Sequence, residues 1–396
     1  MNQAQAVPEI PLQIDAPPVQ ALRELRLRDF RNFREADLRF PAAGVVIVGD
    51  NGSGKTNLLE SIYYLEVFRS LRGARDDQLV RFGADGFHLR GRFERPDTGE
   101  SREVAVGYDA RSRRKRVSVD GAEVERLGDA IGHAAVVLFS PADVVLVSGG
   151  PNERRHFLDI VLCLNRRGYI DALQRFRQAL RQRNSLLRQD AAQEVIDAYE
   201  PGFVESASIV MAERARWIRD NEELFERRNE EVGERPARMR YRPGVRLEAD
   251  ANEATPGRDE LAAALRASLR RNVARERERG MTLYGPHRDD LELTLASADG
   301  DLDLREFGSG GQQRTAAVAL RMVEAQTLRE ARCVEPTVLL DDVFAEFDAR
   351  RSGRILELVG EAGAGQAIFT APKQSDVHGR AASLERWTIA DGRVSA

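Results

Sequence analysis

Lysine is almost absent from this sequence, although charge is not. Charged residues make up 31% of the 396 residues and Lys and Arg together number 60, yet the only lysines are Lys55, Lys115 and Lys373. Arginine carries a planar guanidinium, whereas lysine carries a compact ammonium that acts as a point charge. Nearly every other cation in this chain is an arginine. The lysine at position 55, in a distinctive glycine-rich stretch, therefore indicates that a compact ammonium is needed there.

Cysteine and long apolar runs are also scarce. Only Cys163 and Cys333 are present, both in apolar surroundings, so we expect packed thiols and no disulfide, as in a reducing cytoplasm. No apolar run approaches the roughly 20 residues that span a bilayer. The first residues lack the basic and apolar parts of a signal peptide. We expect residues 1–20 to be a disordered leader and the protein to be cytoplasmic, with no membrane partner.

A strong positive charge is missing as well. The formal net charge is −4, and the chain has only five histidines. Such a chain is not a globally basic nucleic-acid binder, so any such binding needs a local patch. The few histidines, none at ligand spacing, argue against a zinc-type site.

The stretch from Gly49 to Thr56 reads Gly-Asp-Asn-Gly-Ser-Gly-Lys-Thr and matches the phosphate-binding P-loop. The apolar run 45–48 predicts a buried strand before it, and helical spacing over 57–65 predicts a helix after it. Glycines let backbone N–H groups turn toward phosphates, and the helix N-terminus adds its positive dipole end. We assign Lys55 to the phosphates of ATP and Thr56 to Mg²⁺; the alternative is a chance glycine loop. The expected nucleotide contacts are Gly49, Asp50, Asn51, Gly52, Ser53, Gly54, Lys55, Thr56 and Asn57.

The apolar run 338–340 ends in two acids, Asp341 and Asp342, which is a Walker B pattern. A carboxylate at a strand tip beside a P-loop can hold Mg²⁺ through its water shell, and the next acid can orient or deprotonate the attacking water. We therefore assign Asp341 to Mg²⁺ and Asp342 to catalysis. The alternative is an ordinary acidic strand end. The D-loop-like stretch at 345–348 argues against it.

The stretch Ser309-Gly310-Gly311-Gln312 precedes a helical pattern. A serine hydroxyl and glycine N–H groups at a helix N-terminus form an anion nest, and the stretch resembles the signature motif of ABC-type ATPases. That resemblance implies an ATP-sandwiched homodimer in which Ser309, Gly311 and Gln312 reach the γ-phosphate bound by the other subunit, with Ser309 taking part in catalysis. The alternative is a flexible Gly/Ser loop.

The order of patterns predicts an α/β fold interrupted by helices. Alternating residues predict a strand over 22–30 and a second strand that ends near residue 40. An antiparallel meander is expected over 87–119, followed by a buried strand at 136–139. From 151 to 280 the pattern is nearly all helical, broken by Pro and Gly at 233–257, without sustained heptads. A strand is then expected at 291–295, a helix at 312–329, strands at 337–340 and 366–370, and a helix at 349–359. We expect a P-loop NTPase head of the ABC type, lobe I, from 21–140 and 281–396, and a mainly helical insert, lobe II, from 141–280.

Several longer stretches resemble the RecF family of bacterial recombination and repair proteins. They are 27–33, 139–143, 154–159, 285–290 and 341–344, in addition to the motifs above. The resemblance implies a weak, DNA-stimulated ATPase that dimerises on ATP and binds double-stranded DNA near single-strand gaps. It also implies cooperation with RecR and RecO to load RecA, in recombinational repair, replication restart and the SOS response to DNA damage.

The chain departs from this family in its leader of about 20 residues and at Thr370 and Gln78, and the family-like stretch 285–290 has two possible places. Thr370 stands where a γ-phosphate sensor is expected, and we assign it that contact. Gln78 is our candidate Q-loop ligand of Mg²⁺, with a surface polar residue as the alternative. The stretch 285–290 lines either the nucleotide cleft or the junction of the lobes.

Two arginine clusters are candidates for DNA phosphate contacts. Residues 151–190 hold nine arginines and four acids, and a second cluster lies at 111–116 on an expected hairpin. Such arginines neutralise phosphates without reading bases, although a charge run is often only a solvated face, and Arg154 and Arg155 would alternatively serve the lobe interface. The expected DNA contacts are Arg113, Arg114, Lys115, Arg116, Arg177 and Arg181.

Two other functions share the nucleotide motifs. One is the ATP-binding subunit of a membrane transporter, and the other is a structural SMC-like ATPase with coiled-coil arms. The long helical insert opposes the first, and the absence of heptads opposes the second.

Overall fold

The computed structural model describes residues 20–95, 97–233, 235–247, 255–297, 300–342, 349–361, 365–377 and 379–395. The expected leader and the D-loop-like stretch 345–348 lie outside these residues. Within them, no helix combines the length and the apolar character that crossing a bilayer requires. Both cysteines are free; Cys163 is partly buried, but Cys333 is exposed, so our expectation of a packed thiol is wrong there.

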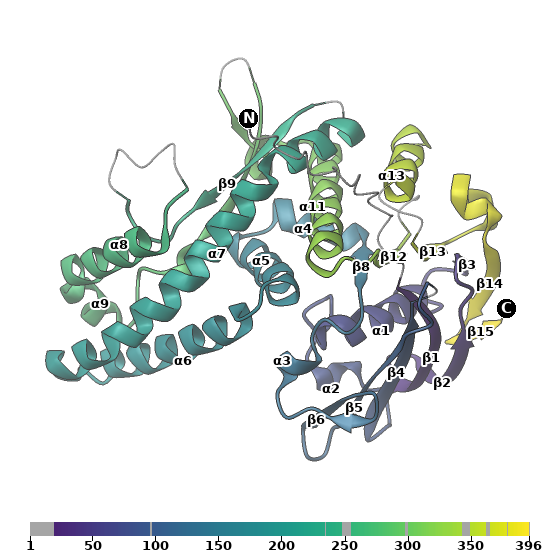
Figure 1. Ribbon diagram of the computed structural model, residues 1–396, viewed down its shortest axis with the longest axis horizontal. Coiled ribbons are helices and arrows are strands. Elements are labelled where there is room, and N and C mark those ends of the chain that lie inside the picture. Colours follow the sequence, from purple (N-terminus) through teal and green to yellow (C-terminus); the bar gives the residue numbers. More distant parts are fainter. Residues whose placement is uncertain are drawn as a thin grey trace, which may run out of the picture.

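Lobe I contains two six-stranded sheets (Figure 1). The antiparallel sheet has the order β2-β1-β4-β5-β6-β7 and the other sheet the order β15-β14-β3-β13-β12-β8. The strands expected at 22–30, in the 87–119 meander, at 136–139, 337–340 and 366–370 are all present. Their bounds are β1 Ala21–Phe30, β2 Phe33–Arg39, β4 Gly86–Glu94, β5 Ser101–Asp109, β6 Arg114–Val119 and β7 Ala122–Glu123, then β3 Gly44–Val48, β8 Val136–Phe139, β12 Thr337–Leu340, β13 Ala367–Ala371, β14 Glu385–Ala390 and β15 Arg393–Ser395.

The second sheet brings distant parts of the chain to one edge. Strands β3, β13, β12 and β8 run parallel, and their carboxyl-terminal ends are paired: Val48 with Ala371, Leu340 with Phe139, and Leu340 with Phe369 near the end of β13. Ligands of such sheets bind outside the carboxyl ends of the strands. The P-loop after β3 and the two acids after β12 therefore share this edge.

Helix α1, Lys55–Val67, follows the P-loop and is buried along most of its length. It packs in one core with residues of both sheets, including Leu25 of β1 and Val45 of β3. Its two buried glutamates are paired with arginines, Glu60 with Arg31 and Glu66 with Arg332. The P-loop is thus held between two rigid layers.

Lobe II holds the long helices on the other side of the molecule (Figure 1). They are α5 Pro151–Asn165, α6 Tyr169–Arg188, α7 Gln193–Gly233, α8 Arg258–Arg271 and α9 Val273–Arg279. Their apolar faces form a second core that includes Phe157, Phe203 and Trp217. The nearly all-helical pattern expected from 151 to 280 is confirmed for these five helices.

One strand of lobe II escaped our sequence reading. Strand β9, Ala237–Arg242, lies in the stretch that we took only as a break between helices. Ala237, Met239 and Tyr241 alternate there with arginines, the period of a strand. It pairs with β10, Asp290–Leu295, in a three-stranded sheet completed by β11, Leu302–Asp303. Strand β10, which we expected in lobe I, therefore belongs structurally with lobe II.

Helix α11, Gly310–Arg332, connects the two lobes. Its residues Ala316 and Leu320 lie in the core of lobe II, whereas Val318 and Met322 lie in a third core with β8 and β12. Helix α13, Ala349–Glu361, contributes Ile355 to that third core. Figure 1 shows α11 between the long helices and the second sheet.

Candidate nucleotide-binding site

The P-loop is closed so tightly that two of its glycines cannot be replaced without strain. A Cβ on Gly49 would lie 2.4 Å from the carbonyl oxygen of Ile389. Gly54 has φ +115°, a conformation that L side chains rarely adopt, and a Cβ there would lie 2.6 Å from Nδ2 of Asn32. The glycine spacing that identified the loop thus has a steric cause.

Lys55 folds back over the loop. Its side chain is only 4% exposed, and Nζ donates hydrogen bonds to the carbonyl oxygens of Gly49 (2.8 Å) and Asp50 (3.3 Å). Nζ also lies 3.7 Å from Oδ2 of Asp342. Oγ of Ser53 is buried in the same loop and has no hydrogen-bond partner among the described residues. An ammonium among oxygens and an unsatisfied buried hydroxyl fit a phosphate ligand.

Thr56, Asp341 and Thr370 meet at the shared edge of the sheet. Oγ1 of Thr56 donates to Oδ1 of Asp341 at 3.1 Å, and Oγ1 of Thr370 donates to the same oxygen at 2.9 Å. Burial raises the pKa of Asp341, and these two hydroxyls together with the charge of Arg72 oppose the rise. The hydroxyl and carboxylate oxygens are ligands that Mg²⁺ prefers. Since the described residues contain no cluster of three or more His, Cys, Asp or Glu able to hold a metal, phosphates and water would have to complete its shell.

Thr370 forms hydrogen bonds with both Walker B acids. It is fully buried, and its Oγ1 accepts a hydrogen bond from the backbone N–H of Asp342 at 2.9 Å. Asp342 itself has φ +46°, and its side chain is 23% exposed. The hydroxyl of Thr370 is therefore engaged with both acids, so its position indicates a residue that orients them, and contact with the γ-phosphate stays a prediction.

The signature stretch caps α11. Oγ of Ser309 accepts a hydrogen bond from the N–H of Gln312 at 3.3 Å, and Oε1 of Gln312 accepts one from the N–H of Ser309 at 2.8 Å. This reciprocal capping box fixes an exposed helix N-terminus with its positive dipole end toward solvent. A Cβ on Gly311 would lie 3.1 Å from Nη1 of Arg351. Within the described part of the chain, no contact joins Ser309 or Gln312 to the P-loop of the same molecule.

Gln78 is not brought to the metal position. It lies in the short helix α2, Asp76–Leu79, where its Oε1 accepts a hydrogen bond from the N–H of Arg75 at 2.9 Å. Its carbonyl oxygen accepts a hydrogen bond from Arg31 at 3.3 Å. The side chain is thus used to cap a helix, and in the described structure it contacts neither Thr56 nor Asp341.

Two residues beside the site carried no signal that we recognised. Asn32 donates through Nδ2 to the carbonyl oxygen of Ser53 (3.1 Å) and accepts through Oδ1 from Nδ2 of Asn57 (2.8 Å). It therefore links the turn after β1 to the P-loop. Arg72 is exposed in the loop after α1, close enough for its charge to lower the pKa of Asp341. Only the fold brings either residue to the site; Asn32 lies in the family-like stretch 27–33, the one available hint.

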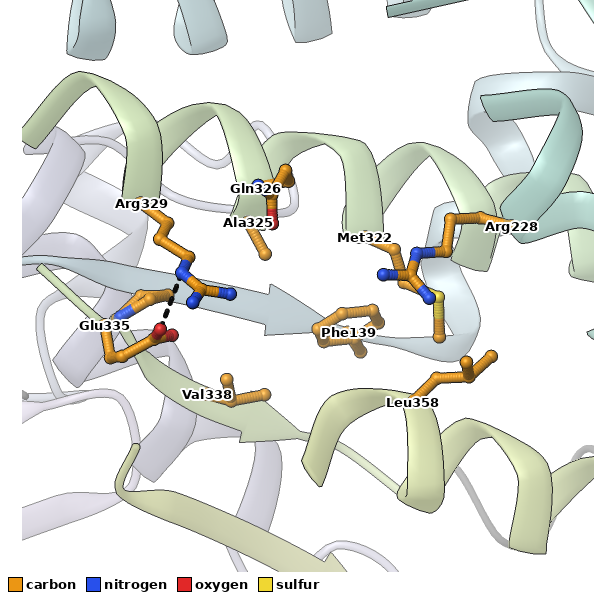
Figure 2. A pocket seen from close by; sticks show the side chains of 10 residues that line it. Phe139, Arg228, Met322, Ala325, Gln326, Arg329, Glu335, Val338 and Leu358 are labelled. Atoms are coloured by element: carbon orange, nitrogen blue, oxygen red, sulfur yellow. Dashed lines mark ion pairs between the residues drawn. The ribbon is translucent and has the colours of Figure 1, made fainter. Parts of the chain in front are cut away.

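A separate pocket lies beneath α11 and is not the nucleotide site. It is lined by apolar residues of β8, β12, α11 and α13, among them Phe139, Val338 and Leu358. Figure 2 shows Arg329 pointing to Glu335 at one end, 2.7 Å away, and Arg228 of α7 at the other end. None of the P-loop, Walker B or signature residues lines it.

Several cations of the two arginine clusters are already engaged in contacts within the protein. At the β5–β6 hairpin Arg113, Arg114 and Arg116 are exposed, but Lys115 is not free: Nζ lies 2.8 Å from Asp76 and donates to the carbonyl oxygen of Phe68 at 2.8 Å. Our assignment of Lys115 to DNA is therefore corrected to a structural role.

In the cluster at 151–190, buried ion pairs use several of the arginines. Arg154 pairs with Asp290, and Arg183 pairs with Glu276. Arg177 is 40% exposed and pairs with Asp159 at 2.9 Å, whereas Arg181 is exposed. The positive surface of α6 is thus smaller than the residue count indicates.

The stretch 285–290 lies in lobe II. Asp289 is fully buried and accepts hydrogen bonds from Arg214 (2.8 Å), Tyr241 (2.7 Å) and the N–H of Gly244 (2.7 Å). Burial raises the pKa of Asp289, and Arg214 opposes the rise. The stretch therefore packs against α7 and β9 of lobe II, and of the two places that we considered the nucleotide cleft is not supported.

Comparison with known proteins gives consistent results. A family model described as RecF/RecN/SMC N terminal domain matches residues 21–392. The chain is 36% identical over 367 residues to the DNA replication and repair protein RecF of Salinibacter ruber, which covers 89% of this chain and 85% of that protein. It is 34% identical over 375 residues to the protein of the same name from Myxococcus xanthus, covering 94% and 96%.

Solved structures agree with these relatives. A structure of the recombination mediator protein RecF with ATP, described as part of the RecFOR pathway, superimposes with a TM-score of 0.83 at 27% identity, covering 97% of this chain and 99% of that chain. A Smc head bound to the C-winged helix domain of ScpA has a TM-score of 0.53 at 16% identity, covering 94% of this chain and 96% of that chain. The latter shares the fold alone.

Proposed function

Because this chain belongs to the RecF family of DNA replication and repair proteins, we propose that it is an ATP-dependent DNA-binding protein of recombinational repair and replication restart. ATP joins two copies into a dimer that binds double-stranded DNA near single-strand gaps, and slow hydrolysis separates them. By analogy with the pathway named for its solved relative, it acts with RecR and RecO to help load RecA. The family match over nearly the whole chain favours this function over a transporter subunit or a coiled-coil SMC protein.

The single observation that carries the proposal is the separation of the two anion-binding loops. The P-loop and the acids are assembled within one chain through the Thr56–Asp341 hydrogen bond. Ser309 caps a different, exposed helix, and the described residues provide no contact between it and that P-loop. A helix N-terminus that is preformed for an anion and has no described contact with the P-loop of its own chain fits a phosphate held by a second copy. Two copies then form two composite sites.

Within each composite site the chain supplies distinct groups. Lys55 and the loop N–H groups bind phosphates, and Thr56 and Asp341 hold Mg²⁺, which would neutralise phosphate charge. Asp342 orients the attacking water, with Thr370 fixing its backbone. Ser309 of the second copy reaches the γ-phosphate. Hydrolysis therefore removes the group that holds the copies together.

DNA binding is tested by retention on gapped DNA. The expected result is retention that requires ATP and Mg²⁺ and weakens as salt rises, because phosphate contacts release counterions. Lys55→Met, which removes the phosphate anchor, is the matched control and should abolish it. Retention by the unsubstituted protein that is independent of ATP, or no retention at low salt, would refute the proposal.

A further inference from the structure

Phe82 is the most exposed large apolar side chain in the described structure. It is 99% exposed, whereas Phe307 follows at 65%. Phe307 ends α10, Leu304–Phe307, two residues before Ser309, so a second copy would cover it. Phe82 has no such explanation, and aromatic side chains are the groups on which proteins stack nucleic-acid bases.

A rigid turn presents the Phe82 ring. The N–H of Ala84 donates to the carbonyl oxygen of Arg81 at 2.9 Å, and Gly83 has φ +81°. These values define a type II turn with Phe82 at its first corner and glycine at the position that requires positive φ. The N–H and Nε of Arg81 donate to the backbone and carboxylate oxygens of Asp29, at 2.8 and 2.7 Å. Little conformational freedom remains to be lost when the ring binds.

The hairpin that contacts this turn carries unpaired cations. Asp85 follows it directly; its carbonyl oxygen accepts from the N–H of Ala110 (2.8 Å) and its carboxylate pairs with Arg111 (2.8 Å). These contacts fix the turn against the β5–β6 hairpin, whose Arg113 and Arg114 are exposed (Figure 1 shows α2 near β5 and β6). Neither arginine has an ion pair among the contacts of the described residues. The surface thus combines one aromatic face with free guanidinium groups.

The surroundings of Phe82 favour a nucleic-acid base over a protein. Protein-binding anchors are surrounded by contacts that exclude water, but the neighbours of Phe82 are Arg81, Gly83, Ala84 and Asp85. Base stacking needs only one aromatic face with cations for the phosphates. Inside a duplex each base is covered by its neighbours, and opening a step costs a few kcal/mol. At the edge of a gap one base face is open.

We propose that Phe82 stacks on the base exposed at the edge of a single-strand gap, with Arg113 and Arg114 binding the adjacent phosphates. This inference rests on the proposed function and adds to it the group that distinguishes gapped from continuous duplex. Phe82 then supplies preference for the gap, and the arginines supply affinity for any DNA.

The test compares gapped and continuous duplexes of the same sequence, with 2-aminopurine at the gap edge and Mg²⁺-ATP present. Stacking is worth about 1–3 kcal/mol per base, or roughly 5- to 150-fold. Phe82→Ala and Phe82→Leu should lose the preference for gapped DNA by at least fivefold and leave 2-aminopurine unquenched, while binding to continuous duplex is unchanged. Phe82→Trp should restore both. Tyr199→Ala, an exposed aromatic of lobe II, is the matched control and should behave as the unsubstituted protein.

Three results would overturn the inference. The first is an unchanged gap preference and unchanged quenching in Phe82→Ala. The second is equal recovery by Phe82→Leu and Phe82→Trp, which would show that apolar area and not an aromatic face matters. The third is loss of binding to a partner protein with DNA binding intact. If the unsubstituted protein shows no ATP-dependent DNA retention, the proposed function fails as well, which separates that case from the other three.

Discussion

Glu66 lies 2.9 Å from Arg332, and this ion pair joins the ends of the two helices that carry the phosphate-binding loops. Glu66 lies in the last turn of α1, which begins at the P-loop, and Arg332 is the last residue of α11, which begins at the signature. The carboxylate is fully buried. Nη1 of Arg332 also donates to the carbonyl oxygens of Gly132 and Ala134. The two loops are therefore connected through the interior of one protomer.

The Glu66 pair should make stability depend on pH. Burial raises the pKa of Glu66 from 4.5 to about 7, although Arg332 opposes the rise. The pKa of Glu66 is higher in the folded than in the unfolded protein. The protonated carboxyl therefore contributes stability that is fully present below about pH 4.5 and is lost as the pH rises through about 7. Denaturant unfolding from pH 5 to 8 should show a flatter pH dependence in Glu66→Gln, by about 2 kcal/mol across the window. Parallel curves for the two proteins would remove Glu66 from this role.

Asn32 should position the P-loop. Asn32→Ala removes the hydrogen bonds to Ser53 and Asn57, each worth about 1 kcal/mol. We expect ATP affinity to fall roughly tenfold with the fold intact, as measured by titration of a fluorescent ATP analogue. Asn221→Ala, which removes a bond to Trp217 within α7, is the matched control. Equal affinity for both variants would show that Asn32 is not needed at the site.

Asp342 should act in hydrolysis and not in binding. Asp342→Asn keeps the shape of the side chain but removes the charge 3.7 Å from Lys55. We expect turnover to fall by about 100-fold or more, ATP binding to persist, and the dimer to live longer. Single-turnover hydrolysis measures the turnover, and sedimentation of the ATP-bound protein measures the persistence of the dimer. Turnover within a factor of two of the unsubstituted protein would exclude the role.

Lys115 and Arg114 are neighbours with opposite expected roles. Lys115→Met breaks the contacts with Asp76 and Phe68 and should lower the free energy of unfolding by about 1–2 kcal/mol with DNA affinity unchanged. Arg114→Gln should leave stability unchanged and weaken DNA binding at low salt. If Lys115→Met weakened DNA binding and Arg114→Gln lowered the free energy of unfolding, both assignments would be wrong.

The difference between these neighbours shows what the sequence could and could not predict. Residue type and spacing located the P-loop, the Walker B acids and the signature, because each is a local stretch between a strand and a helix. The alternation at 116–119 also predicted most of the strand that carries Lys115, which begins at Arg114. Whether a cation on that strand is free or paired depends on α2, which lies 35 or more residues earlier, and no local pattern contains that information.

The same limit applies to β9 and Asn32. Proline and glycine around residues 233–257 hid a short strand whose partner, β10, follows nearly 50 residues later. Asn32 reaches the P-loop only because β1 and β3 belong to sheets packed on the same helix. Such long-range pairing is decided by tertiary packing and not by local propensity.

Ser309→Arg separates the composite site from ATP binding within one chain. The variant replaces the exposed cap of α11 and leaves every P-loop contact of its own chain in place. Sedimentation with Mg²⁺-ATP should show a dimer for the unsubstituted protein and a monomer that still binds ATP for Ser309→Arg, with Lys55→Met as the variant that does neither. If Ser309→Arg dimerises on ATP as the unsubstituted protein does, the account is contradicted.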